Sequence, residues 1–145
     1  MKFVIQRVTE ASVEVERRIV GEIGTGFLVL IGVGQGDTTA QADRLIRKMT
    51  GLRIFADENG KTNLSLADVG GGLLLVSQFT LYANCTKGYR PSFTEAGDPQ
   101  KAEELYNYII RECRKVIPVV EQGVFGAEMK VRLCNDGPFT ILLEA

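Results

Sequence analysis

Alternating hydrophobic and polar positions at the start of the chain predict two β-strands, over residues 2–8 and 12–16. Val13 and Val15 point to one side of the second strand, and the polar residues around them point to the other. The stretch GFLVLIGVG (26–34) is apolar on both faces, which is typical of a central strand. The first third of the chain is therefore expected to supply strands to a buried sheet.

Further strands are expected in the rest of the chain. GLRIF (51–55) predicts a short one, and GGLLLVSQFTLYA (71–83) predicts a long one that is apolar at first and mixed later. Near the C-terminus, EMKVRLC (128–134) and FTILLEA (139–145) are β-like and flank the segment NDGPFT (135–140). We predict a hairpin here, with NDGPFT as its turn.

Two helices are predicted from apolar spacing and end signals. Asp37 is the expected N-cap of a helix over 38–50, and Asp98, followed by Pro99, is the N-cap of a second helix that ends before Pro118. The predicted buried positions are Ala42, Leu45, Ile46 and Met49 in the first helix and Ala102, Leu105, Tyr106, Ile109, Ile110 and Cys113 in the second.

The order of these elements predicts a single domain over residues 1–145 of the α/β class. Strands come first, strand–helix units follow twice, and strands return at the end, with no repeat or linker between them. This order favours a sandwich in which the helices cover a sheet that packs on a second sheet.

Composition limits the chemistry that is available. The chain has 145 residues and a net charge of −1, a weak electrostatic footprint for binding long stretches of nucleic acid, although it allows binding to the tip of an RNA. Its three cysteines form no C-x-x-C pair, and it has neither a signal-peptide core nor an apolar run long enough to span a bilayer. We expect a cytoplasmic protein.

Histidine is absent from the chain. This excludes Ser-His-Asp and Cys-His nucleophiles and histidine-ligated zinc, and we expect neither a metal nor a cofactor. An enzyme of this composition must use carboxylates, lysine, tyrosine, hydroxyls, backbone groups or the substrate itself.

The stretch SQFTLYA (77–83) brings polar side chains abruptly into an apolar strand. An extended chain would place Gln78, Thr80 and Tyr82 on one face and Ser77, Phe79 and Leu81 on the other. Either the strand simply leaves the core here, or these groups form a pocket wall for a polar substrate.

Two loops carry weaker signals. GVGQGD (32–37) does not complete the G-x-G-x-x-G phosphate motif and indicates a tight turn. TKGYRPSF (86–93) combines basic and aromatic residues, which suits phosphate contact with base stacking, although a solvated surface loop explains it equally well.

NDGPFT places Pro138, which has no backbone N–H, where a return strand should begin to pair. Taken alone, it indicates a turn with a trans proline, since only about 5–6% of X-Pro bonds in folded proteins are cis.

Taken together, these stretches resemble the D-aminoacyl-tRNA deacylases of the bacterial and eukaryotic type, over essentially the whole chain. The matching segments are QRVTEASVEV, GFLVLIGVGQGDT, GLRIF, DVGG, SQFTLYA, KGYRPSF, FGAEM and NDGPFT, the last of which fits the family's Asn-x-Gly-Pro-x-Thr motif. Two small departures are the segment ERRI, which lacks a glycine often found there, and Phe139, at a position that is more often aliphatic.

The resemblance implies a homodimer of three-layer α/β/β subunits that hydrolyses the ester between a D-amino acid and the 3′-terminal adenosine of tRNA, and glycyl-tRNA as well. Cofactor, metal, membrane and DNA are not expected. The implied catalytic residues, near the ester and the terminal ribose, are Ser77, Gln78, Phe79 and Thr80. The implied residues for substrate binding and chiral selection are Gly137 and Pro138, joined by a cis bond and inserted into the partner's pocket, with Arg7, Phe125 and Asn135.

Two mechanisms and two other functions stay open. Thr80 is a covalent nucleophile in one mechanism; in the other, which we favour, water attacks with help from the ribose 2′-hydroxyl while backbone N–H groups of SQFTL stabilise the oxyanion. The alternatives to an enzyme are a nucleic-acid-binding module and a structural dimer paired through an edge strand.

Overall fold

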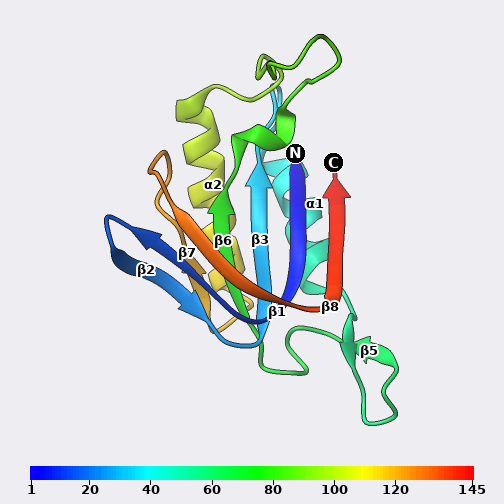
Figure 1. Ribbon diagram of the computed structural model, residues 1–145. Helices are drawn as coiled ribbons and strands as arrows, with labels where there is room; N and C mark the ends of the chain where they lie inside the picture. The colour runs from blue at the N-terminus through cyan, green and yellow to red at the C-terminus, as the bar shows by residue number, and fades with distance from the viewer.

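The computed structural model describes residues 1–145 as a mixed α/β fold in which two helices cover one face of a bent sheet (Figure 1). The strands are β1 (Lys2–Val15), β2 (Arg18–Ile23), β3 (Gly26–Gly32), β4 (Phe55–Ala56), β5 (Thr62–Leu64), β6 (Gly72–Ser77), β7 (Val120–Gln122) and β8 (Lys130–Glu144). The helices are α1 (Thr39–Thr50), the 3₁₀ turn η1 (Phe79–Tyr82) and α2 (Pro99–Arg114).

Strand β1 organises the sheet. Its first half pairs with β3 and its second half with β2, while β8 runs antiparallel along its other edge for nearly the whole length. Beyond β3 the sheet continues through β6 and β7, which are parallel to it and to each other. All six strands form one sheet, and β4 and β5 form a separate small one.

The sheet buries apolar side chains on both faces. Alternate residues of β3 and β6, such as Phe27 and Leu75, pack in a cluster of 23 buried residues with α1 and α2. Their neighbours in sequence, such as Leu28 and Leu74, pack in a second cluster of seven, with Val8 and other residues of β1 and β2. The predicted strand apolar on both faces is confirmed over Gly26–Gly32, with Val33 and Gly34 beyond its end, and each buried apolar side chain contributes about 1.5–3 kcal/mol.

The mixed α/β class is confirmed. The predicted packing of the helix-covered sheet on a second sheet is not confirmed, because β1 and β8 continue through the bend and keep six strands in one sheet; the second sheet of the structure is the small one of β4 and β5. For the same reason the two strands predicted over 2–8 and 12–16 are one strand. The strand predicted over 51–55 shrinks to Phe55–Ala56, which pairs with β5.

The two helices form where predicted, with one error. Asp98 caps α2, its carboxylate accepting from the N–H groups of Gln100 and Lys101. The cap of α1 is Thr38 rather than Asp37, and Thr38 forms a capping box with Gln41. Asp37 instead turns inward. Neither helix is long and apolar enough to cross a membrane.

The final hairpin was a wrong prediction. Residues 130–134 and 140–144 both pair antiparallel with β1, so β8 is one strand that passes through NDGPFT without reversing. The register against β1 shifts by two residues between the two halves: NDGPFT is a bulge that holds three extra residues, and β1 has one extra residue, Thr9, next to it.

Candidate functional site

The SQFTLYA segment forms a tight turn at the end of β6. The N–H of Gln78 donates to the carbonyl of Ile31 at 2.7 Å, and the chain then coils into η1, where Leu81 N–H donates back to Gln78 at 3.3 Å. The prediction of an extended strand over 78–83 is therefore wrong. The prediction that Gln78, Thr80 and Tyr82 lie on one face of that strand is wrong for the same reason. The turn directs the Gln78 amide to the Thr80 hydroxyl at 2.5 Å and leaves the Phe79 ring 55% exposed.

Two glycines at the end of β3 make room for this turn. A Cβ on Gly34 would lie 2.6 Å from Cζ of Tyr82, and one on Gly32 would lie 3.0 Å from Cβ of Leu81. The glycine-rich segment thus serves close packing between β3 and η1, in agreement with the prediction of a tight turn.

Asp37 connects the segment next to this turn with the N-terminus of the chain. Asp37 is 6% exposed, and its carboxylate accepts from the α-ammonium of Met1 at 2.9 Å and from the N–H of Gly34 at 2.6 Å. Burial, followed by the nearby charge of Asp37, raises the pKa of Tyr82 to about 12. The helix pattern gave no sign of this role, because the partners of Asp37 come from distant segments of the chain.

A cavity of about 610 Å³ opens beside η1. Its lining is largely apolar, with Ser77 and Gln78 as polar groups and Phe79 and Phe125 as aromatic walls. This size and mixture suit a small organic group. The structure therefore brings Ser77, Gln78, Phe79 and Phe125 together at one cavity, and Thr80 lies next to them in the turn.

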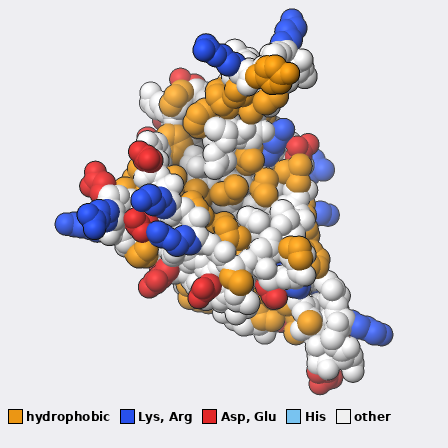
Figure 2. Space-filling model, in the orientation of Figure 1, with side chains coloured by type: hydrophobic (Ala, Val, Ile, Leu, Met, Phe, Trp, Pro, Cys, Tyr) orange, Lys and Arg blue, Asp and Glu red, His pale blue; other side chains and the backbone are white.

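Phe93 is a wall of the cavity that the sequence analysis did not select. Its ring meets that of Phe79 edge-on, with centroids 5.1 Å apart, and both residues line the cavity. The TKGYRPSF signal contained Phe93 but did not indicate its contact. In Figure 2, hydrophobic side chains gather below the projecting loop that carries this segment.

The remaining predicted residues form a second cluster at the bulge of β8. The Asn135 side chain closes the bulge: its Oδ1 accepts from the Phe139 N–H at 2.7 Å, and its Nδ2 donates to Thr140 Oγ1 at 2.9 Å. Arg7 of β1 holds the bulge in place. Its Nε donates to the backbone carbonyl of Asp136 at 2.9 Å, and its guanidinium lies over the Phe139 ring, 4.7 Å from the ring centroid.

Gly137 and Pro138 are exposed at the crest of the bulge, and the peptide bond between them is cis, as the resemblance implied. Arg7, which holds the bulge, also donates to the Ile54 carbonyl at 2.5 Å and is itself only 14% exposed. A short segment with Gly137 and Pro138 at its tip is thus held by the side chains of Arg7 and Asn135.

The two clusters lie at opposite ends of the sheet. The bulge faces residues 6–8 of β1, which pair with the beginning of β3, whereas Ser77 pairs with Ile31 near its end. Four residues along β3 span about 13 Å, and three strand spacings from β8 to β6 add about 14 Å sideways, so the separation is about 20 Å. In Figure 1 the end of β6 lies well above the bend of β8.

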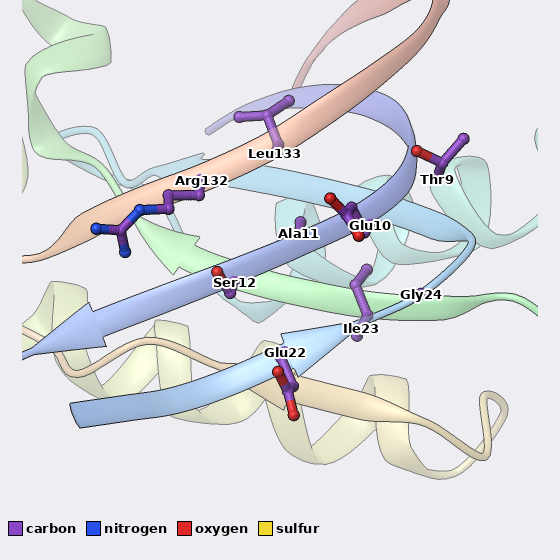
Figure 3. A pocket seen from close by; sticks show the side chains of 9 residues that line it. All are labelled: Thr9, Glu10, Ala11, Ser12, Glu22, Ile23, Gly24, Arg132 and Leu133. Atoms are coloured by element: carbon purple, nitrogen blue, oxygen red, sulfur yellow. The ribbon is translucent and has the colours of Figure 1, made fainter.

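A second hollow, of about 580 Å³, lies on the outer side of β1, β2 and β8 (Figure 3). It is lined by polar residues that include Glu10 and Glu22, and it contains none of the predicted site residues. Arg132 at its edge donates to Glu14 at 2.7 Å, which lowers the pKa of that carboxyl. No group of three or more His, Cys, Asp or Glu side chains is arranged to hold a metal ion.

Comparison with known proteins gives a consistent set of relatives. Residues 4–144 match the family described as D-Tyr-tRNA(Tyr) deacylase. The chain is 55% identical to a D-aminoacyl-tRNA deacylase of Koribacter versatilis, over 100% of this chain and 97% of the relative. It is 54% identical to a D-aminoacyl-tRNA deacylase of Stutzerimonas stutzeri, over 100% of both chains.

Two solved structures are also similar. One, described as a c-Myc DNA Unwinding Element Binding Protein, has a TM-score of 0.94 at 42% identity and covers 100% of this chain and 99% of that one. Another, a probable eukaryotic D-amino acid tRNA deacylase, has a TM-score of 0.82 at 17% identity, covers 98% and 97%, and so shares the fold. The fold and the relatives define the class of aminoacyl-tRNA deacylases. Within that class, this chain belongs to the D-Tyr-tRNA(Tyr) deacylase family.

Proposed function

We propose that this protein hydrolyses the ester bond between a D-amino acid and the 3′-terminal adenosine of tRNA, in the cavity beside η1. The observation that carries the proposal is the cavity itself: aromatic walls suited to a nucleoside lie next to the hydroxyl and amide groups of Ser77, Gln78 and Thr80. The family to which the chain belongs has the same activity in its name.

The surroundings of Thr80 favour water over a threonine nucleophile. The hydroxyl of Thr80 accepts from the Gln78 amide, which cannot take up a proton, and no carboxylate or amine contacts it. A threonine needs such a base to attack an ester. An aminoacyl ester is already activated, so a water assisted by the ribose 2′-hydroxyl suffices. The first N–H groups of a helical turn have no acceptor within the turn, and those of η1 are suited to stabilising the oxyanion.

Chiral selection comes from the bulge of a second copy. Within one chain, Gly137 and Pro138 lie about 20 Å from the cavity, by strand spacing, and cannot reach it. Both are exposed, and β8 also exposes Leu142, at 55%, along the same strand. A twofold dimer formed over β8 would bring the bulge of each subunit to the cavity of the other. In each subunit, the helices and the two parts of the bent sheet would form the three layers of an α/β/β subunit.

Backbone carbonyls of the bulge would accept hydrogen bonds from the substrate's α-ammonium group. With the ester fixed through its ribose, inversion of the α-carbon drives the side chain into the wall. A penalty of about 3 kcal/mol gives discrimination of roughly 150-fold. Glycine has no side chain to exclude, so glycyl-tRNA, including tRNA(Ala) mischarged with glycine, should also be cleaved.

The test is single-turnover deacylation of D-tyrosyl-, L-tyrosyl- and glycyl-tRNA. We expect the D-tyrosyl and glycyl esters to be cleaved and the L-tyrosyl ester to be spared. Thr80→Ala should keep most of the activity, and a terminal 2′-deoxy tRNA should react much more slowly. Near-complete loss in Thr80→Ala, with folding and tRNA binding intact, would establish the nucleophile mechanism instead.

Binding to a DNA element is a second candidate, because the relative at 42% identity is described by that property. The net charge of −1 argues against strong backbone binding by this chain. Filter binding with a DNA duplex tests it: a Kd below micromolar at physiological salt would favour DNA binding.

A further inference from the structure

The loop between η1 and α2 carries a projecting tip that the proposed reaction does not use. Two backbone hydrogen bonds between Asn84 and Ser92, at 2.7 and 2.9 Å, close its base. The Asn84 side chain also accepts from the N–H and the hydroxyl of Thr86, at 3.0 and 2.7 Å. The tip, residues 86–91, therefore extends from a fixed base, and Figure 1 shows it rising beyond the end of the sheet.

The tip is cationic and unpaired. Lys87 and Arg90 are exposed, and neither forms any of the seven ion pairs of the structure or any side-chain hydrogen bond. The whole chain carries −1, so without these two charges it would carry −3. The tip thus concentrates positive charge on a protein that is otherwise acidic, and Figure 2 shows Lys and Arg side chains at its end.

Tyr89 lies between the two cations with its side chain fully exposed. A large aromatic ring that contacts nothing in the protein adds nothing to folding through burial. Cations that flank an exposed ring are typical of surfaces that contact phosphates and stack on unpaired bases.

The tip begins where the cavity wall ends. Phe93 follows Ser92 directly and packs on Phe79 in the cavity. Two residues separate Arg90 from Phe93, and the three Cα–Cα steps between them reach at most about 10 Å. A nucleoside held in the cavity therefore places the phosphates that precede it within range of the tip.

We propose that the tip, through Lys87, Tyr89 and Arg90, binds the sugar–phosphate backbone and an unpaired base of the single-stranded 3′ end of the tRNA substrate. This inference rests on the proposed function. The tip touches no reacting atom, so it acts on substrate binding and leaves the chemical step unchanged. Its phosphate contacts do not depend on sequence.

The experiment compares Lys87→Gln/Arg90→Gln with a matched control, Arg44→Gln/Lys48→Gln, which removes two exposed cations from α1 that form no ion pair. Single-turnover deacylation of D-tyrosyl-tRNA is measured against enzyme concentration, between about 50 and 200 mM salt. The tip variant should raise the half-saturating concentration about tenfold at low salt and lower the log–log salt slope by about 1.4, with the maximal rate unchanged. The control should match the wild type.

Tyr89→Ala should raise the half-saturating concentration roughly fivefold or more, and Tyr89→Phe should not, because stacking needs the ring and not the hydroxyl. D-Tyrosyl-adenosine, which has no phosphate, should be cleaved equally by the wild type and the tip variant. An unchanged salt slope in the tip variant, or a fall in maximal rate alone, would overturn the proposal. If the wild type cleaves neither substrate, the proposed function fails instead.

Discussion

Replacing Gly34 by alanine tests whether the glycine-rich end of β3 exists to seat η1. The new Cβ would lie 2.6 to 2.8 Å from two ring atoms and the hydroxyl oxygen of Tyr82, closer than real contacts allow. Gly34 has no left-handed φ, so its backbone accepts alanine, and the three nearest atoms to the new Cβ all belong to Tyr82. Tyr82 is the last residue of η1, and a displaced ring moves the turn that carries Thr80.

The magnitude follows from two opposing effects. Overpacking of this kind costs about 1–3 kcal/mol, whereas a strain-free Gly→Ala change stabilises by about 0.4–1 kcal/mol through the unfolded chain. Gly34→Ala should therefore destabilise the protein when it is made in the wild type. The same substitution should not destabilise the Tyr82→Ala variant, in which the obstructing ring is absent. The gain through the unfolded chain is the same in both backgrounds and cancels, so the coupling energy between the two sites should equal the overpacking cost, about 1–3 kcal/mol.

Urea unfolding of the four proteins of this double-mutant cycle gives the coupling energy directly. Gly24→Ala is the matched control, since the nearest atom to its Cβ is 4.0 Å away, and it should leave stability unchanged or slightly raised. Deacylation by Gly34→Ala should fall at least tenfold, because misplacement by about 1 Å is costly in catalysis. Wild-type stability in Gly34→Ala, or a coupling energy near zero, would refute the packing role of Gly34.

Three further predictions concern stability. Asp37→Ala leaves the Met1 ammonium buried without its carboxylate and should cost about 3–5 kcal/mol in urea unfolding; a loss below about 1 kcal/mol would contradict the buried pair. Asn135→Ala removes the acceptor of the Phe139 N–H and should cost about 1–2 kcal/mol, with faster hydrogen exchange of that amide; unchanged exchange would show that Asn135 does not close the bulge. Burial raises the pKa of Cys113 and Tyr106 to about 12 each, from 9.0 and 10.0. Both groups stay protonated when the protein is folded and ionise when it is unfolded, so their contribution to stability should be constant below about pH 9 and fall as the pH rises to 12, by up to about 1.4 kcal/mol per pH unit for each group. Cys113→Ala should flatten the first part of this fall, and an equal slope in that variant would contradict the assignment.

The fold was predictable where local signals decide structure. The α2 helix starts at Asp98 and Pro99 because a cap and a fixed φ act within a few residues. The cap of α1 was misplaced by one residue, since Asp37 and Thr38 are both good caps. The choice between them depends on the Met1 ammonium, 36 residues away in sequence.

The site was predictable in its residues but not in its shape. SQFTLYA has the β-propensity of a strand, yet it coils because Gly32 and Gly34 open a space for Leu81 and Tyr82. NDGPFT has the local signature of a hairpin, but β1 offers one continuous edge to both of its flanks. Pairing with a distant strand outweighs turn chemistry here, and it converts a turn into a bulge.

The separation of the two clusters leads to the last prediction, complementation between inactive variants. Gly137→Ala strains the bulge, because Gly137 has φ +139 and its Cβ would lie 3.1 Å from Arg7 Nη2. Ala127→Trp fills the cavity that Ala127 lines. Each variant alone should be inactive in deacylation.

If each cavity uses the bulge of its partner, a mixed dimer joins one intact cavity to one intact bulge. Half of the dimers in an equimolar, re-equilibrated mixture are mixed, and each contains one working site of two, so about a quarter of the wild-type activity should return. Activity confined to one chain cannot recover by mixing, because no chain in the mixture carries both an intact bulge and an open cavity. A mixture as inactive as its parents, with mixed dimers demonstrated by mass, would therefore show that the bulge does not act across subunits.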